Sequence, residues 1–130
     1  MTMPLVADYM ARRLITLAPD QNINHAMNLL LDEKISGAPV VDDEGWLRGV
    51  LSKKDCLRAA IDSSYHRAWN GLVSDYMAPD PVTLNAGRTI LEAAKLFAET
   101  PYRRFPVLEG GALVGQLSRA DALRAMRNLW

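Results

Sequence analysis

The sequence lacks an excess of charge of either sign. Its 130 residues include 15 lysines and arginines and 15 aspartates and glutamates, so the formal net charge is zero at neutral pH. Proteins that bind nucleic acids through the phosphate backbone normally carry a basic excess, because they neutralise phosphate charges. The balanced composition therefore argues against nucleic acid as a partner.

Cysteine and long apolar runs are also scarce. The single cysteine, Cys56, has no second cysteine in this sequence to pair with, and we expect it to be a small buried side chain rather than a reactive thiol. No apolar run approaches the roughly 20 residues that span a bilayer. The N-terminal MTMPLVADYM lacks the basic-then-apolar order of a secretory signal. These features predict no membrane partner and a reducing, cytoplasmic location.

What the sequence does contain is an internal repeat. Residues 6–23 (VADYMARRLITLAPDQNI) align without a gap with residues 73–90 (VSDYMAPDPVTLNAGRTI), and the match continues through APVV and FPVL. The repeating unit of about 55 residues is longer than that of helical solenoids. We therefore divide the chain into a first repeat (1–61), a linker (62–72) and a second repeat (73–130).

Each repeat predicts the same order of elements, β-α-β-β-α. A short β-type run (LITL, 14–17, or PVTL, 81–84) precedes an amphipathic helix (22–34 or 89–99), a hairpin with a tight acidic or glycine turn, and a closing helix. Such a unit is too small to bury its sheet face alone. We expect an α+β fold, an α/β-type sandwich in which the repeats pack sheet to sheet about a pseudo-twofold axis. Tyr65, His66 and Trp69 of the linker are expected to pack against the junction of the repeats.

Motifs of catalytic and metal sites are not found. The sequence has no Walker loop, no GxGxxG, no GxSxG elbow and no metal-type cluster of cysteine and histidine. His25 is predicted to lie on a solvated helix face, and His66 has no neighbouring ligand residue. The sequence therefore predicts no catalytic residues and no metal.

The strand-to-helix junction is written twice, as GVLSKKD (49–55) and GQLSRAD (115–121). Ser52 and Ser118 can cap a helix, with Asp55 and Asp121 completing a capping box. The cations that follow each serine oppose the helix dipole, and they suit an anion site at a helix N-terminus. Two interpretations stay open at this point, a cap with surface charges and an anion site. The residues that could add to the site are Gly49 and Gly115, which allow close approach, and the cations Lys53, Lys54, Arg103, Arg104 and Arg119.

At this point the residues resemble a known family. The DYM openings, the ITL and VTL runs, the GAPVVDDEG and RFPVLEGG hairpins and the doubled junction resemble the CBS domain, named for cystathionine β-synthase. Two such domains in tandem resemble a Bateman module, here over residues 4–127. The resemblance implies a non-catalytic, regulatory, energy-sensing module that requires no cofactor. It would bind AMP, ADP, ATP or S-adenosylmethionine in clefts between the repeats.

The resemblance also implies roles for individual residues. Asp55 and Asp121 would accept hydrogen bonds from the ribose hydroxyls, because a carboxylate only accepts. The cleft that receives Arg103 or Arg104 would be the stronger phosphate site, because a guanidinium grips phosphate with two hydrogen bonds. The phosphate candidates are Ser52, Ser118, Lys53, Arg119, Arg103 and Arg104, and the base candidates are Thr16, Thr83, Ala38, Pro39, Phe105 and Pro106.

A second function remains open beside the sensor. The same fold could serve as a ligand-independent scaffold for dimerisation or protein interaction, while catalysis has no support in the residues. In this family, tandem domains commonly pair through the helices after the first β-runs and the closing helices, which implies a homodimer. An unidentified protein target would receive the signal.

Overall fold

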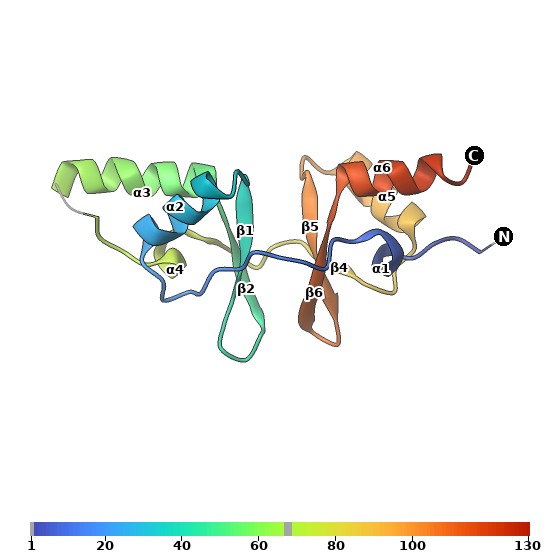
Figure 1. Ribbon diagram of the computed structural model, residues 1–130, viewed down its shortest axis with the longest axis horizontal. Coiled ribbons are helices and arrows are strands. Elements are labelled where there is room, and N and C mark those ends of the chain that lie inside the picture. The colour runs from blue at the N-terminus through green and yellow to red at the C-terminus, as the bar shows by residue number, and fades with distance from the viewer. Residues whose placement is uncertain (1, 67–68) are drawn as a thin grey trace. The chain divides into compact units, whose positions relative to one another are not determined.

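The computed structural model describes residues 2–66 and 69–130 and divides the chain into two compact units (Figure 1). The first unit is Ile15–Pro81, and the second unit is Met1–Leu14 together with Val82–Trp130. These boundaries do not coincide with those of the sequence repeats. Each unit consists of the main part of one repeat and the opening segment of the other.

The first unit contains a three-stranded antiparallel sheet in the order β1-β2-β3. A hairpin of β1 (Gly37–Val41) and β2 (Leu47–Ser52) forms most of it, and the short β3 (Ala78–Pro79) pairs with β2 at Gly49 and Val50. The helices of this unit are α2 (Ile23–Asp32), α3 (Lys53–His66) and α4 (Val73–Tyr76). The helix α3 begins directly where β2 ends, as the repeated junction predicts.

The second unit repeats this plan with one difference in its sheet. The strands β5 (Arg104–Glu109) and β6 (Ala112–Ser118) form an antiparallel hairpin, and β4 (Leu84–Asn85) pairs in parallel with β5. The helices are α1 (Val6–Tyr9), α5 (Ile90–Glu99) and α6 (Arg119–Arg127). Two three-stranded sheets with helices confirm the predicted α+β class.

The first β-run of each repeat is shorter than predicted. In the run 14–17, only Leu17 makes a bridge, to Val40, and in the run 81–84 only Leu84 lies in a strand, the two-residue β4. Leu17 exchanges two hydrogen bonds with its neighbours, donating to the Pro39 carbonyl at 2.9 Å and accepting from the Val41 N–H at 2.9 Å. These two hydrogen bonds form an isolated β-bridge, which is too short to be a strand.

The segment predicted as a linker is helical in its first part. The helix α3 continues to His66, and residues 67–68 lie outside the described part of the chain. Tyr65 is 81% exposed and Trp69 is 42% exposed. Tyr65 therefore does not pack within its own unit, and the expectation that this aromatic triplet packs against the junction of the repeats stays a prediction.

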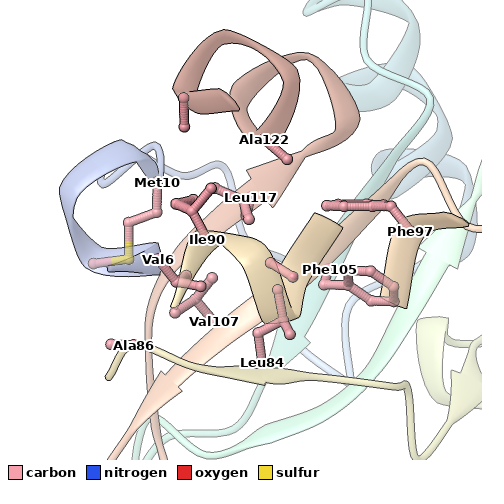
Figure 2. Packing of buried hydrophobic residues seen from close by; sticks show 12 residues of the cluster. Val6, Met10, Leu84, Ala86, Ile90, Phe97, Phe105, Val107, Leu117 and Ala122 are labelled. Atoms are coloured by element: carbon pink, nitrogen blue, oxygen red, sulfur yellow. The ribbon is translucent and has the colours of Figure 1, made fainter. Parts of the chain in front are cut away.

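Each unit has its own apolar core. In the second unit, the rings of Phe97 and Phe105 lie next to each other with centroids 4.6 Å apart (Figure 2). Val6 and Met10, from the opening segment, point into the same cluster (Figure 2). The core of the first unit is formed by Leu17, Ile23, Ala26, Leu30, Ala38, Val40, Leu51, Cys56, Ala59 and Val73. Val73, like Val6, comes from the opening segment of the other repeat.

Each unit therefore packs the opening segment of the other repeat, which we call the exchange of opening segments. This exchange requires the two glycines of the junction motif. A Cβ on Gly49 would lie 2.6 Å from the Ala78 carbonyl oxygen, and a Cβ on Gly115 would lie 2.8 Å from the Ala11 carbonyl oxygen. Real Cβ atoms do not approach other atoms this closely. A strand glycine can admit either a close backbone or a flat ligand, and both of these positions have a close backbone.

Replacing Gly115 with alanine is expected to destabilise the protein by about 1–3 kcal/mol, as overpacking does. The added Cβ would meet Met10 Sδ at 2.6 Å as well as the Ala11 carbonyl. Without that clash, alanine would stabilise a strand relative to glycine. Urea unfolding followed by circular dichroism measures the change. Gly87→Ala is the control, since its Cβ would meet only the Asn85 side chain, at 3.3 Å. A Gly115→Ala protein as stable as the wild type would contradict this account.

Candidate functional site

The junction of the first unit forms where β2 passes into α3. The Asp55 N–H donates to Ser52 Oγ at 3.1 Å, and the Ser52 N–H donates to Asp55 Oδ2 at 2.9 Å. The Ser52 hydroxyl donates to the same carboxylate oxygen, also at 2.9 Å. These reciprocal bonds confirm the predicted capping box.

The junction of the second unit has the same geometry, where β6 passes into α6. The Asp121 N–H donates to Ser118 Oγ at 3.1 Å, and the Ser118 N–H donates to Asp121 Oδ2 at 2.9 Å. The side chains of Asp55 and Asp121 are 13% and 18% exposed. Both carboxylates are therefore held in place but still reach solvent.

An arginine one turn further along each helix completes the junction. Arg58 Nη2 lies 2.6 Å from Asp55 Oδ1, and Arg124 Nη2 lies 2.8 Å from Asp121 Oδ1. Sequence reasoning missed both arginines. The signal was present, because DCLR and DALR place an arginine three residues after each aspartate, where helix side chains are neighbours.

Three arginine candidates gather at the N-terminus of α6. Arg104 pairs with Ser118 across the β5–β6 ladder, and the Arg119 N–H donates to the Arg103 carbonyl at 2.9 Å. The Arg119 guanidinium donates to the Thr100 carbonyl at 3.2 Å. In the first unit, the residue opposite Ser52 is Gly37. The α6 junction therefore has a cationic residue, Arg104, opposite its serine, whereas the cations of the α3 junction, Lys53 and Lys54, lie on the helix itself and are exposed.

The apolar base candidates lie on β1 and β5. Ala38 and Phe105 are each 1% exposed and belong to the two cores. Because side chains alternate along a strand, Pro39 and Pro106 lie on the opposite sheet faces. Both prolines are buried. Of these four side chains, only the prolines therefore face away from the cores.

The two threonine candidates differ in their surroundings. Thr16 is exposed and precedes Leu17, the residue that bridges to β1. Thr83 is half-buried and lines a polar cavity of about 550 Å³ beside α5. The candidates thus form two groups, Thr16, Ala38, Pro39, Ser52, Lys53 and Asp55 in the first unit, and Thr83, Arg103, Arg104, Phe105, Pro106, Ser118, Arg119 and Asp121 in the second.

The local environment changes the acidity of Asp121. Burial alone would raise the pKa of this carboxyl group, but hydrogen bonds from the Ser118 N–H, the Arg124 guanidinium and the Ser118 hydroxyl outweigh burial. The pKa is therefore lowered from its ordinary value of 3.8. Asp121 is a carboxylate at neutral pH and can act only as a hydrogen-bond acceptor.

The lowered pKa predicts how Asp121 contributes to stability as pH changes. As the pH is lowered, the carboxyl group of the unfolded chain binds its proton near pH 3.8, whereas that of the folded protein binds it only at a lower pH. The stabilisation is complete above that pH and is lost as the pH falls through the lower folded pKa. We expect Asp121→Asn to cost stability at pH 7 and to cost less at pH 3, as measured by urea unfolding. A cost that is the same at both pH values would contradict the prediction.

Cys56 has the structural role that its sequence context predicts. It is 4% exposed, and burial, with a smaller contribution from the Asp55 charge, raises the pKa of its thiol. A raised pKa lowers the thiolate fraction, and the thiolate is the reactive form.

Metal-ligand side chains do not gather anywhere in the described part of the chain. Within 2–66 and 69–130, no group of three or more histidine, cysteine, aspartate or glutamate side chains could hold a metal ion. His25 and His66 are both exposed. None of the described helices has the length and apolar character needed to cross a membrane.

Comparison with known proteins decides the family. Residues 6–62 and 73–128 each match the CBS domain. The chain belongs to the CBS domain family. The predicted family and its tandem arrangement are thereby confirmed, and each matched stretch contains one of the two Ser-x-x-Asp junctions.

Several known proteins are similar over nearly the whole chain. The uncharacterized protein MJ1225 of Methanocaldococcus jannaschii is 28% identical over 96% of this chain and 44% of its own length. The chloroplastic CBSX2 of Arabidopsis thaliana is 31% identical over 92% of this chain and 62% of its own. YhcV of Bacillus subtilis is 30% identical over 97% of this chain and 89% of its own. This chain thus spans less than two-thirds of the length of each of the first two relatives, 44% and 62%.

Solved structures agree with this assignment. The crystal structure of CBSX2 in complex with AMP has a TM-score of 0.84 and 32% sequence identity, covering 97% of this chain and 98% of that chain. The CBS domain pair of MJ0100 has a TM-score of 0.79 at 20% identity and is similar in fold. The architecture of the chain is that of a CBS pair.

Proposed function

We propose that this protein is a non-catalytic regulatory module that binds an adenosine-bearing ligand at its two Ser-x-x-Asp junctions, with AMP as the first candidate. The observation that carries the proposal is the similarity to CBSX2, whose crystal structure is a complex with AMP. The other candidates are ADP, ATP and S-adenosylmethionine. No cofactor is required for this function.

The junction geometry supports ribose binding. Asp55 and Asp121 are fixed by capping bonds and arginine contacts, so their orientation is set before a ligand arrives. A carboxylate has about four acceptor positions. Three are used on Asp121, by the Ser118 N–H, the Ser118 hydroxyl and Arg124. One position remains on Asp121 for a ribose hydroxyl.

The remaining candidates would hold the phosphate and the base. The N-termini of α3 and α6 offer N–H groups and nearby cations to an anion. We assign phosphate contacts to Ser52, Lys53, Ser118 and Arg119, and the larger share to Arg103 and Arg104. Thr16, Thr83, Pro39 and Pro106 are proposed to line the base, with Ala38 and Phe105 supporting these walls from the cores.

A thermal-shift panel with AMP, ADP, ATP and S-adenosylmethionine tests the function directly. A ligand present at a hundred times its dissociation constant adds about 2.7 kcal/mol to the stability of the folded state. GMP serves as the control for the base. A flat response to all four adenosyl ligands would reject the sensor and favour the ligand-independent scaffold.

The phosphate assignment has its own test. In the double variant Arg103→Ala/Arg104→Ala, affinity for AMP should fall about tenfold while affinity for adenosine stays the same, because each charge-assisted hydrogen bond contributes about 1.5–3 kcal/mol before solvent exposure is discounted. Isothermal titration calorimetry measures both constants. Unchanged AMP affinity would remove these arginines from the site.

We also propose that the protein forms a homodimer through its helices. On α3, Leu57 and Ile61 are 62% and 50% exposed, and Leu31 on α2 is 53% exposed. Leu31 and Leu57 line an apolar groove of about 210 Å³ between α2 and α3. A Leu57→Glu protein should be monomeric by analytical ultracentrifugation, and a wild-type monomer would reject the proposal.

We further propose that the protein acts in a reducing compartment such as the cytoplasm and passes its signal to an unidentified protein target.

A further inference from the structure

We propose that Arg58 is a positioning residue for the ligand: it orients the Asp55 carboxylate and links that carboxylate to the segment through which the chain leaves the first unit. The inference rests on the proposed binding of an adenosine-bearing ligand at Asp55. It adds a residue and a direction of coupling to that site.

One oxygen of the Asp55 carboxylate, Oδ1, makes no bond to the capping serine. Oδ2 accepts two hydrogen bonds from Ser52, from its N–H and its hydroxyl, so both of its acceptor positions are used. Oδ1 is the oxygen left for a ribose hydroxyl. Arg58 Nη2 donates to this oxygen at 2.6 Å, a short charge-assisted bond that fixes its direction.

Arg58 has a second partner, the backbone carbonyl of Tyr76. The same Nη2 donates to the Tyr76 carbonyl oxygen at 3.1 Å, 18 residues further along the chain. The Tyr76 hydroxyl donates to Asp62 Oδ2 at 2.8 Å, so α4 is tied to successive turns of α3 at two points. Because one nitrogen serves both Asp55 and Tyr76, a change at the carboxylate reaches the end of α4.

The segment that begins after Tyr76 leads out of the first unit. This segment forms β3, where Pro79 lies opposite Gly49, and Pro81 is the last residue of the first unit. Gly49 allows the segment to approach closely, since a Cβ there would lie 2.8 Å from Met77 Sδ. Arg58 is thus connected, through Tyr76 and β3, to the point where the chain passes out of the unit.

The second repeat provides an internal comparison. Arg124 holds Asp121 Oδ1 at 2.8 Å, as Arg58 holds Asp55. Among the described residues, however, Arg124 makes no hydrogen bond to the carbonyl of Tyr9, the counterpart of Tyr76. Tyr9 is tied instead through its hydroxyl, which accepts from Asn128 Nδ2 at 3.1 Å. Of the two arginines, Arg58 therefore combines the carboxylate contact with a contact to the opening segment, and Arg124 does not.

A ribose hydroxyl that donates to Oδ1 would share this oxygen with Arg58. The guanidinium then shifts its hydrogen bonding toward the Tyr76 carbonyl, and the amides of residues 73–79 change their protection from exchange. Ligand binding at Asp55 is in this way coupled to α4 and β3 of the same unit.

The experiment compares Arg58→Gln with the matched variant Arg124→Gln. Affinities for AMP and for 2′,3′-dideoxy-AMP are measured by calorimetry, and amide exchange of residues 73–79 is measured with and without AMP. For Arg58→Gln, AMP affinity should fall about fivefold, as expected for a partly exposed ion pair, while dideoxy-AMP affinity is unchanged. The AMP-dependent change in exchange should disappear in Arg58→Gln and persist in Arg124→Gln. Arg58→Lys should restore part of the AMP affinity, because lysine supplies the charge without the fork.

Tyr76→Phe separates positioning from stability. It removes the other tie of α4, to Asp62, and leaves Arg58 in place. It should lower stability without changing the ratio of AMP to dideoxy-AMP affinity. The inference is overturned if Arg58→Gln keeps that ratio, or if Tyr76→Phe changes it equally. If the wild type binds no adenosyl ligand, the proposed function fails and takes the inference with it.

Discussion

Replacing Phe105 with alanine is expected to destabilise the second unit by about 3–5 kcal/mol, the usual cost of truncating a buried phenylalanine. The Phe105 side chain is 1% exposed and packs between Phe97, at 4.6 Å, and Tyr102, at 5.8 Å between ring centroids. Truncation removes two aromatic contacts and leaves a cavity among atoms that β5 and α5 hold apart (Figure 2). Since domains are stable by only about 5–15 kcal/mol, much of the folding free energy would be lost.

Urea unfolding of Phe105→Ala measures this effect. Leu123→Ala is the control, because Leu123 is 72% exposed on α6 and its truncation should change stability by less than about 0.5 kcal/mol. A loss below about 1 kcal/mol in Phe105→Ala would show that the ring is not part of a close-packed core.

The second large effect is expected on ligand affinity. The double variant Asp55→Asn/Asp121→Asn should weaken AMP binding about a hundredfold, because hydrogen bonds to a charged acceptor contribute about 1.5–3 kcal/mol and asparagine presents a donor where the ribose also donates. Calorimetry measures the dissociation constant, and the unfolding free energy is measured in parallel because both aspartates also cap helices.

Asp62→Asn provides the control for charge. Asp62 lies on α3 but outside the junction, with its carboxylate bonded to the Tyr76 hydroxyl. Its replacement should leave AMP affinity within about twofold, a difference of about 0.4 kcal/mol. If the double variant bound AMP as the wild type does, ribose recognition would have to be assigned to other residues.

Much of the fold could be predicted from local patterns. The helices after the first β-runs, the hairpins with their acidic or glycine turns, and the capping boxes at Ser52 and Ser118 all depend on residues close in sequence. The core position of Ala38 also follows from a local pattern, because Ala38 and Val40 lie on one face of β1, whereas only the family resemblance predicts Ala38 as a base candidate.

The remainder depends on contacts between distant segments, which a single sequence does not display. Nothing near GVLSKKD shows that Gly49 faces the Ala78 carbonyl, or that Arg58 reaches the Tyr76 carbonyl. The exchange of the opening segments was missed for the same reason. Val6 and Val73 look like ordinary helix residues of their own repeats, and only the folded chain shows each buried with the other repeat.

The exchange of opening segments has a consequence for how such a chain could arise. A half-length polypeptide, translated by itself, would expose the apolar side of its own opening segment and leave its hairpin glycine without a neighbouring backbone. Two copies of that polypeptide could cover both by exchanging their opening segments, as in a domain-swapped dimer. Fusing the two copies head to tail would make the exchange intramolecular, so that its stability would no longer depend on protein concentration.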